Sequence, residues 1–170
     1  LASDLDEALR AIGLIVGSDV PFCVSGGTSL AEGRGERLTD LPPLPVCQIV
    51  LCKPDFGIST PELFVLADGA VLSKRPDIAG LTAALQGGEL TGVTDRLCNV
   101  FEEFLPERYR EVFRIKEILL AHGALNAAMS GSGPTVYGIF ESAVEAQRAA
   151  EVLKKSYQQT YVAKPVKKLV

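Results

Sequence analysis

Hydrophobic positions along the chain follow two periods, and each period predicts a different kind of element. Helical spacing is found over residues 5–16, just after Gly57, and over 76–86, 89–104, 106–123 and 142–157. Short apolar or alternating runs typical of strands are found at residues 21–27, 28–38, 46–54, 125–129, 135–140 and 160–166. From residue 45 onward the order is strand, helices, strand, strand, helix, strand. This order predicts an α+β fold with a ferredoxin-like split β-α-β layer and extra helices.

Short local motifs mark where several of these elements begin and end. Asp4 is a candidate N-cap of helix 5–16, and Ser59 or Thr60 can cap a short helix that has Pro61 in its first turn. His122 ends helix 106–123, and we expect it to contact the free carbonyls there.

Glycine and proline divide the first third of the chain. Gly26 and Gly27 predict a hairpin between strands 21–27 and 28–38. Residues 41–45, LPPLP, are the best candidate for a linker or domain boundary. The apolar run at 46–54 predicts a strand that is buried on both faces.

Composition narrows the class of protein. The 170 residues are 47% hydrophobic and 22% charged, which is typical of a globular chain. No apolar run approaches the roughly 20 residues that cross a membrane, and a net charge of −4 argues against a nucleic-acid partner. The four cysteines show no CxxC spacing and the only histidine lies far from them, so no metal site is expected. Four cysteines without a basic signal segment indicate buried thiols and a cytoplasmic location.

The stretch MSGSGPTVYGIF, residues 129–140, carries the first candidate for chemistry. Small residues form its turn: Ser130, Gly131, Ser132 and Gly133. The turn lacks the Lys-Ser/Thr pair of a P-loop and leads into a strand, not a helix. Glycines at such a place either make a tight corner or let a phosphate or substrate approach the backbone, and both interpretations stay open here.

Two other positions have an ordinary structural interpretation. Asp19 lies in the short connector GSDVPF, where an aspartate usually forms a turn or caps a helix. Phe64 lies in the short helix after Gly57, where an aromatic ring usually packs in the core. From the residues alone, the chain is an α/β domain with a glycine-rich turn and one unusually placed aspartate.

Four stretches of the sequence, taken together and in their order, are more specific for a protein family than any one of them alone. They are GSDVPFCVSGG, LAEGRGE, KPDFGISTPELF and MSGSGPTVYGIF, and together they span residues 17–140. In this combination the chain resembles the superfamily of galactokinase, homoserine kinase, mevalonate kinase and phosphomevalonate kinase. The stretches GSDVPF and LAEGRGE are similar to its diphosphocytidyl branch.

The resemblance implies a small-molecule kinase of the non-mevalonate isoprenoid pathway. Such a kinase uses ATP, with Mg²⁺, to phosphorylate the 2-hydroxyl of 4-diphosphocytidyl-2-C-methylerythritol. The family's catalytic aspartate falls on Asp19, and its cytosine-stacking aromatic falls on Phe64. Two further residues would border the substrate pocket: Thr60 and Arg34. The turn that supports the phosphate loop would comprise Ser130, Gly131, Ser132 and Gly133.

Parts of the family pattern have no match in this chain. The glycine-rich ATP loop, the lysine that pairs with the catalytic aspartate and a second cytosine-stacking aromatic would all lie before Leu1. The resemblance therefore implies that residues 1–44 are the tail end of an N-terminal kinase domain and residues 45–170 a C-terminal domain. We expect the chain to need the missing N-terminal segment for activity, since it begins with Leu1 and its only methionine is Met129. Two alternatives stay open: another kinase of the superfamily, or a non-catalytic binding domain without the ATP loop.

Overall fold

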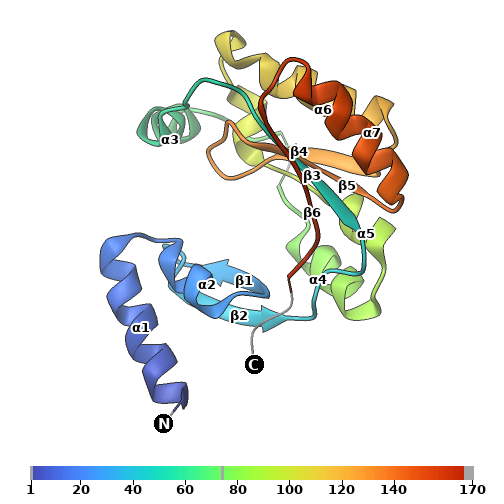
Figure 1. Ribbon diagram of the computed structural model, residues 1–170. Coiled ribbons are helices and arrows are strands. Elements are labelled where there is room, and N and C mark those ends of the chain that lie inside the picture. Colours follow the sequence, from blue (N-terminus) through green and yellow to red (C-terminus); the bar gives the residue numbers. More distant parts are fainter. Residues whose placement is uncertain (1, 74, 167–170) are drawn as a thin grey trace.

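A computed structural model of the protein describes residues 2–73 and 75–166 (Figure 1). Its helices are α1 (Ala2–Val16), α2 (Val20–Ser25), α3 (Thr60–Asp68), α4 (Ile78–Gly87), α5 (Leu90–Thr94), α6 (Glu111–Ala121) and α7 (Ala143–Lys154), with the 3₁₀ turns η1 (Val100–Phe104) and η2 (Glu107–Tyr109). Its strands are β1 (Thr28–Glu32), β2 (Arg37–Leu41), β3 (Gln48–Lys53), β4 (Asn126–Met129), β5 (Val136–Phe140) and β6 (Gln159–Ala163).

Four of the strands form an antiparallel sheet in the order β4-β5-β3-β6. Val50 at the centre of β3 lies opposite Gly138 of β5 on one side and Val162 of β6 on the other. Helices α6 and α7 cover one face of this sheet (Figure 1). Two helix-connected strand pairs interleaved in this way make a ferredoxin-like layer, so the α+β fold predicted from the sequence is confirmed.

The main core lies between the sheet and these two helices. Val50 and Cys52 of β3, Ile115 of α6 and Leu153 of α7 are all 0% exposed. The intervening β3 residues point to the opposite face and are only half-buried. The prediction that strand 46–54 is buried on both faces is therefore wrong, because only one face of β3 lies under the α6 and α7 helices.

The segment before residue 42 folds differently from the sequence-based prediction. Residues 20–25 form α2 and not a strand, because Pro21 occupies the first helical turn, where an amide hydrogen bond is not needed. The hairpin is formed by β1 and β2, and its turn lies at residues 33–36 instead of at Gly26 and Gly27. Gly33 and Gly35, at φ 68° and φ 108°, supply the left-handed backbone that the turn requires.

Some predicted helix ends agree with the structure and others differ from it. Asp4 lies inside α1 and is not its N-cap, and the predicted helix over 89–104 divides into α5 and η1. Ser59 does cap α3, where its hydroxyl accepts a hydrogen bond from the Glu62 amide at 3.4 Å. The ring Nδ1 of His122 lies 2.7 Å from the carbonyl of Ile118, which confirms the predicted contact at the end of α6.

The cysteines divide into two pairs. Cys47 and Cys52 are buried, and burial raises the pKa of both thiols. Cys23 and Cys98 are exposed, so the prediction that all four thiols are buried is wrong for these two. All four are free. None of the helices described is long and apolar enough to cross a bilayer.

Candidate functional site

The glycine turn connects β4 to β5 and is closed by two backbone hydrogen bonds. The Ser130 amide donates to the Thr135 carbonyl at 2.8 Å, and the Gly133 amide donates to the Ser130 carbonyl at 2.9 Å. Gly131, at φ 55°, faces open space: a Cβ added there would meet no atom within 4 Å. A Cβ on Gly133, at φ 76°, would lie 2.4 Å from the sulfur of Met129. Gly133 thus serves packing, whereas the Gly131 backbone is open to a ligand.

Helix α3 joins this turn through a pair of hydroxyls. The Thr60 Oγ1 lies 2.7 Å from the Ser132 Oγ, although the two residues are 72 positions apart. The structure therefore brings together one residue predicted to border the substrate and one predicted to support the phosphate side.

Phe64 lies on the same helix with 55% of its surface exposed. Its ring meets the ring of Phe101 at an interplanar angle of 84°, with 5.3 Å between centroids. The neighbouring Leu63 is fully buried and anchors the helix, while Glu62 forms an ion pair with Arg108 of η2. The core interpretation of Phe64 is wrong, because more than half of the side chain is accessible on an anchored helix.

Asp19 immediately precedes α2 and is exposed. Its backbone carbonyl accepts a hydrogen bond from the Cys23 amide at 3.1 Å, but its side chain does not cap the helix. The carboxylate has no hydrogen-bond or ion-pair partner among residues 2–73 and 75–166. Pro21, fully buried two positions later, fixes the start of the helix. The backbone that carries the Asp19 carboxylate is therefore fixed, and the carboxylate itself is accessible to a ligand.

The β1–β2 turn lies against the residue that precedes Asp19. A Cβ added to Gly35 would stand 2.7 Å from the carbonyl oxygen of Ser18, so the two backbones are in close contact. Arg34, exposed at the tip of the same turn, donates its amide to the Glu36 carboxylate at 2.6 Å. Hydrogen bonds from the amides of Glu36 and Arg34 hold the pKa of the Glu36 carboxyl below its usual value. Arg34 is therefore positioned beside the Asp19 connector, though no hydrogen bond links the two.

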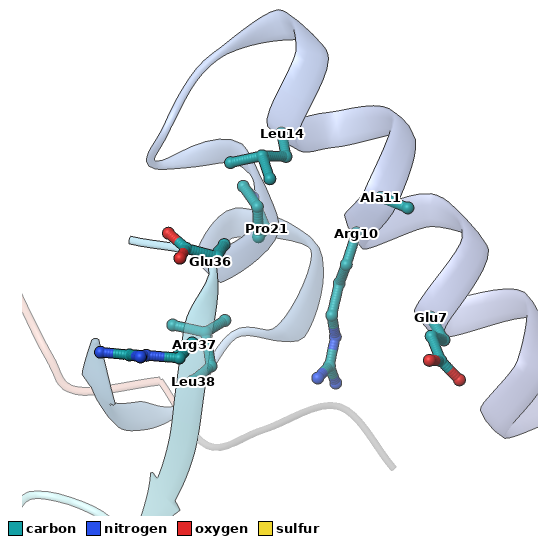
Figure 2. Close-up of a pocket in the computed structure, with 8 residues that line it drawn as sticks. All are labelled: Glu7, Arg10, Ala11, Leu14, Pro21, Glu36, Arg37 and Leu38. Carbon is teal, nitrogen blue, oxygen red and sulfur yellow. The ribbon is translucent and has the colours of Figure 1, made fainter. Parts of the chain in front are cut away.

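A cavity of about 640 Å³ lies between α1 and β2, with Pro21 at its wall (Figure 2). Figure 2 shows the Arg10 side chain extending from α1 into this space. The Arg10 Nε is buried and has no hydrogen-bond partner among the described residues. A buried donor without a partner costs free energy. A polar group that entered this cavity and accepted a hydrogen bond from Arg10 would remove that cost.

Two residues that sequence reasoning missed, Asn99 and Glu102, bond to the end of β4 and to the glycine turn. The Asn99 side-chain amide donates to the carbonyls of Met129 at 2.7 Å and Gly131 at 2.8 Å. The Glu102 carboxylate accepts a hydrogen bond from the Met129 amide at 2.6 Å and pairs with Lys116. The spacing Asn-x-x-Glu is that of a capping box, and it could have marked a helix start within residues 89–104.

A smaller cavity of about 340 Å³ lies next to these residues, lined among others by Asn99, Gly131 and Tyr137. Burial, and then the negative charge of Glu102, raise the pKa of Tyr137. Within the described part of the chain, no group of three or more His, Cys, Asp or Glu side chains could hold a metal ion.

Comparison with known proteins gives this arrangement a class. Residues 81–159 match the sequence family described as GHMP kinases C terminal. The chain thus contains the sequence pattern of a GHMP kinase C-terminal domain. Its fold is similar to that of homoserine kinase from Cytophaga hutchinsonii, with a TM-score of 0.60 and 20% identity over 88% of this chain and 51% of that one.

Three of the similar proteins are kinases that act on the same named substrate. It is 42% identical to the 4-diphosphocytidyl-2-C-methyl-D-erythritol kinase of Enterococcus faecalis, over 98% of this chain and 58% of the relative. It is 37% identical to the enzyme of the same name from Clostridium novyi, over 95% of this chain and 58% of the relative. A crystal structure of 4-(cytidine 5'-diphospho)-2C-methyl-D-erythritol kinase superposes with a TM-score of 0.75 and 27% identity, over 92% of this chain and 56% of that one. The chain thus spans less than three-fifths of the length of these relatives.

Proposed function

We propose that the polypeptide carrying this chain transfers the γ-phosphoryl group of ATP to the 2-hydroxyl of 4-diphosphocytidyl-2-C-methyl-D-erythritol. The observation that carries the proposal is 37–42% identity, over 95–98% of this chain, to two kinases of that name. The reaction belongs to the non-mevalonate route to isoprenoid precursors. Four free cysteines suit its proposed place in a reducing cytoplasm.

In this proposal Asp19 acts on the acceptor hydroxyl. The hydroxyl oxygen forms a bond to the γ-phosphorus, the bond from that phosphorus to the β–γ bridging oxygen breaks, and the hydroxyl proton passes to the Asp19 carboxylate. Phosphoryl transfer asks a protein mainly for positioning and charge. The exposed carboxylate lies at the start of α2 and has no partner among the residues that the structure describes, which supports this role.

The cytidine group would lie against α3. The ring of Phe64 is accessible and also contacts the ring of Phe101, so it is suited to stack on a flat base. Thr60, at the start of the helix, and Arg34, beside the Asp19 connector, would border the rest of the substrate. Their exposure and their neighbours support this arrangement.

The phosphate side would use the turn made by Ser130, Gly131, Ser132 and Gly133. The open backbone at Gly131 fits the approach of a phosphate or of a loop that holds one. ATP supplies the phosphoryl group. Mg²⁺ is expected with it and would be held largely by phosphate oxygens, so we assign no step to the ion.

A further kinase segment completes the proposed site. We propose that it occupies the cavity between α1 and β2, where a carbonyl or carboxylate of that segment would accept a hydrogen bond from the buried Arg10 Nε. The share of the relatives that this chain does not span, with the chain covering 58% of two of them, is the proposed source of that segment and of the ATP loop.

The test is a phosphoryl-transfer assay on the complete polypeptide with three acceptors offered separately. We expect ATP-dependent phosphorylation of 4-diphosphocytidyl-2-C-methyl-D-erythritol, and none of homoserine or mevalonate. Transfer to either of the latter would assign a different kinase of the family. Cytidine nucleotide binding without transfer to any acceptor would show a non-catalytic binding protein.

A further inference from the structure

Strand β4 is an edge of the sheet, and its last residue is bonded by side chains on its outer side. Met129 lies opposite Val136 of β5, while its own amide donates to Glu102 and its carbonyl accepts from Asn99, at 2.6 and 2.7 Å. The second amide hydrogen bond of Asn99 reaches the Gly131 carbonyl inside the turn. Both donated bonds of this side chain therefore fix the place where β4 ends and the turn begins.

Glu102 connects the same point to the main core. Its second oxygen pairs with the Lys116 ammonium of α6, and the two side chains are only 15% and 21% exposed. Breaking this largely buried ion pair is unfavourable because it would leave one buried charge without a partner. The Met129 amide is thus attached, through one carboxylate, to a helix of the core.

The segment that carries these residues also reaches helix α3. The Asn99 Oδ1 accepts a hydrogen bond from the Phe101 amide at 3.0 Å, which starts η1, and the Phe101 ring meets Phe64. The Thr60–Ser132 hydroxyl pair joins α3 back to the turn. Turn, η1 and α3 therefore form a closed ring of contacts.

We propose that Asn99 and Glu102 are positioning residues that set the conformation of the glycine turn, with Asn99 also holding Phe101 behind Phe64. Neither side chain needs to touch a ligand for this role. The effect on the turn is a property of the chain itself, whereas any effect on phosphoryl transfer rests on the proposed function.

Asn99→Asp separates the two tasks of Asn99. The variant keeps an oxygen that accepts from the Phe101 amide, but it places an acceptor against the carbonyls of Met129 and Gly131. Hydrogen exchange on the 170-residue chain, followed by NMR, should show the Ser130 and Gly133 amides exchanging about tenfold faster or more, since one lost hydrogen bond is worth about that factor. Amides of the α6–α7 core should keep their protection.

Asn126→Asp is the matched control at the other end of β4. The Asn126 amide donates to the Thr94 carbonyl at 2.7 Å and its oxygen accepts from the Ala127 amide at 2.8 Å. Like Asn99, this asparagine donates to a distant carbonyl and accepts from a nearby amide, but it makes no bond to the glycine turn. This variant should leave Ser130 and Gly133 exchange unchanged. Unchanged exchange in Asn99→Asp, or an equal increase in both variants, would overturn the role of Asn99.

Glu102 is tested by comparing two substitutions. Glu102→Gln keeps an acceptor for the Met129 amide, whereas Glu102→Ala removes it. We expect the Gln variant to restore at least half of the lost protection at the Met129 amide relative to the Ala variant. Equal loss in the two variants would overturn the assignment of Glu102 to this amide.

Activity of the complete polypeptide gives an independent readout. Asn99→Asp should lower kcat about tenfold while the Kd for cytidine diphosphate stays within about twofold, because Phe101 keeps its hydrogen bond. Equal losses of kcat and cytidine binding would overturn the separation. A wild-type enzyme without transfer would refute the proposed function and leave the exchange result standing, whereas normal exchange in Asn99→Asp would refute only the positioning role.

Discussion

The two ends of the chain differ in how they are held together. In the layered region from β3 to β6, the main cluster of buried residues runs from Val50 to Tyr157 and lies between sheet and helices. In the region from α1 to β2, Ile12, Ile15 and Val16 are 60%, 87% and 78% exposed on α1. The two clusters of buried apolar residues found in the described part of the chain lie outside α1, α2 and β1. A hairpin and two helices of this kind have little stability of their own.

This difference separates stability from candidate chemistry. The exposed carboxylate of Asp19 lies in the lightly packed region, while the glycine turn and Phe64 are attached to the layered one. Residues that act on ligands commonly lie on connections positioned by a rigid scaffold. Here the scaffold supports one side of the proposed site directly, and the other side depends on contacts such as Gly35 against Ser18.

The sharpest test of the comparison is Asp19→Asn in the complete polypeptide. We expect kcat to fall about 10²–10⁴-fold, the usual contribution of an acid–base group, while the free energy of unfolding changes by less than about 0.5 kcal/mol. Steady-state assays and denaturant titration measure the two quantities. Asp95→Asn, at an exposed aspartate after α5, is the control and should alter neither. Near-normal turnover in Asp19→Asn would remove Asp19 from the mechanism.

The stability contrast is tested with two isoleucines. Ile115→Ala in α6, where the side chain is 0% exposed, should destabilise the 170-residue chain by about 2–5 kcal/mol because it leaves a cavity. Ile15→Ala in α1, where the side chain is 87% exposed, should change the free energy of unfolding by less than about 0.5 kcal/mol. Equal losses in urea titrations would show that the α1 region belongs to the same packed core.

Phe64→Ala tests the ligand surface of the layered region. The KM for the cytidine substrate should rise about 10- to 100-fold, since stacking on a base is worth about 1–3 kcal/mol, while the KM for ATP stays within twofold. Phe104→Ala is the control, because Phe104 also meets Phe101 edge-on, at 5.9 Å between centroids. It should leave both KM values unchanged, and parallel increases for the two substrates in Phe64→Ala would contradict stacking.

The smallest expected effect concerns Tyr157, which lies between α7 and β6 and donates a hydrogen bond to Glu111 of α6. Burial, followed by that hydrogen bond, raises the pKa of Tyr157 to about 12 from an ordinary value near 10. The unfolded chain ionises first, so the stabilisation is complete below pH 10 and is lost as the pH rises toward 12. Wild type should therefore lose up to about 2.5 kcal/mol relative to Tyr157→Phe over this interval.

Urea titrations at stepped pH measure that difference. Tyr161→Phe is the control, since Tyr161 lies on β6 with 60% of its surface exposed. A constant gap between wild type and Tyr157→Phe from pH 9 to pH 12 would contradict the assignment.

The two regions also differed in how well the sequence predicted them. The strands of the four-stranded sheet are compact apolar runs, and their order followed from the pattern. Residues 21–25 have the aromatic and β-branched content of a strand, yet Pro21 starts a helix there, and Val20 packs against Gly13, where an added Cβ would lie 2.9 Å away. A tertiary contact of this kind outweighs local propensity.

Of the candidate site, the sequence supplied the individual residues through a family resemblance but not their contacts. Thr60 and Ser132 were predicted separately, and their meeting depends on how the fold brings α3 to the β4–β5 turn. Asn99 and Glu102 lie in a segment predicted as one helix, and their bonds to residues about 30 positions away have no local signal. The roles of Asp19, Phe64, Thr60, Arg34 and the glycine turn stay predictions, and the Asp19 and Phe64 variants above test the first two directly.

The bonds of Asn99 and Glu102 to Met129 have a consequence for how this chain meets other chains. An edge strand normally offers unpaired amides and carbonyls on which a foreign strand can assemble. At the end of β4 these groups are already occupied by side chains of the same molecule. The bonds that hold the turn therefore also protect this end of the sheet from strand-to-strand aggregation.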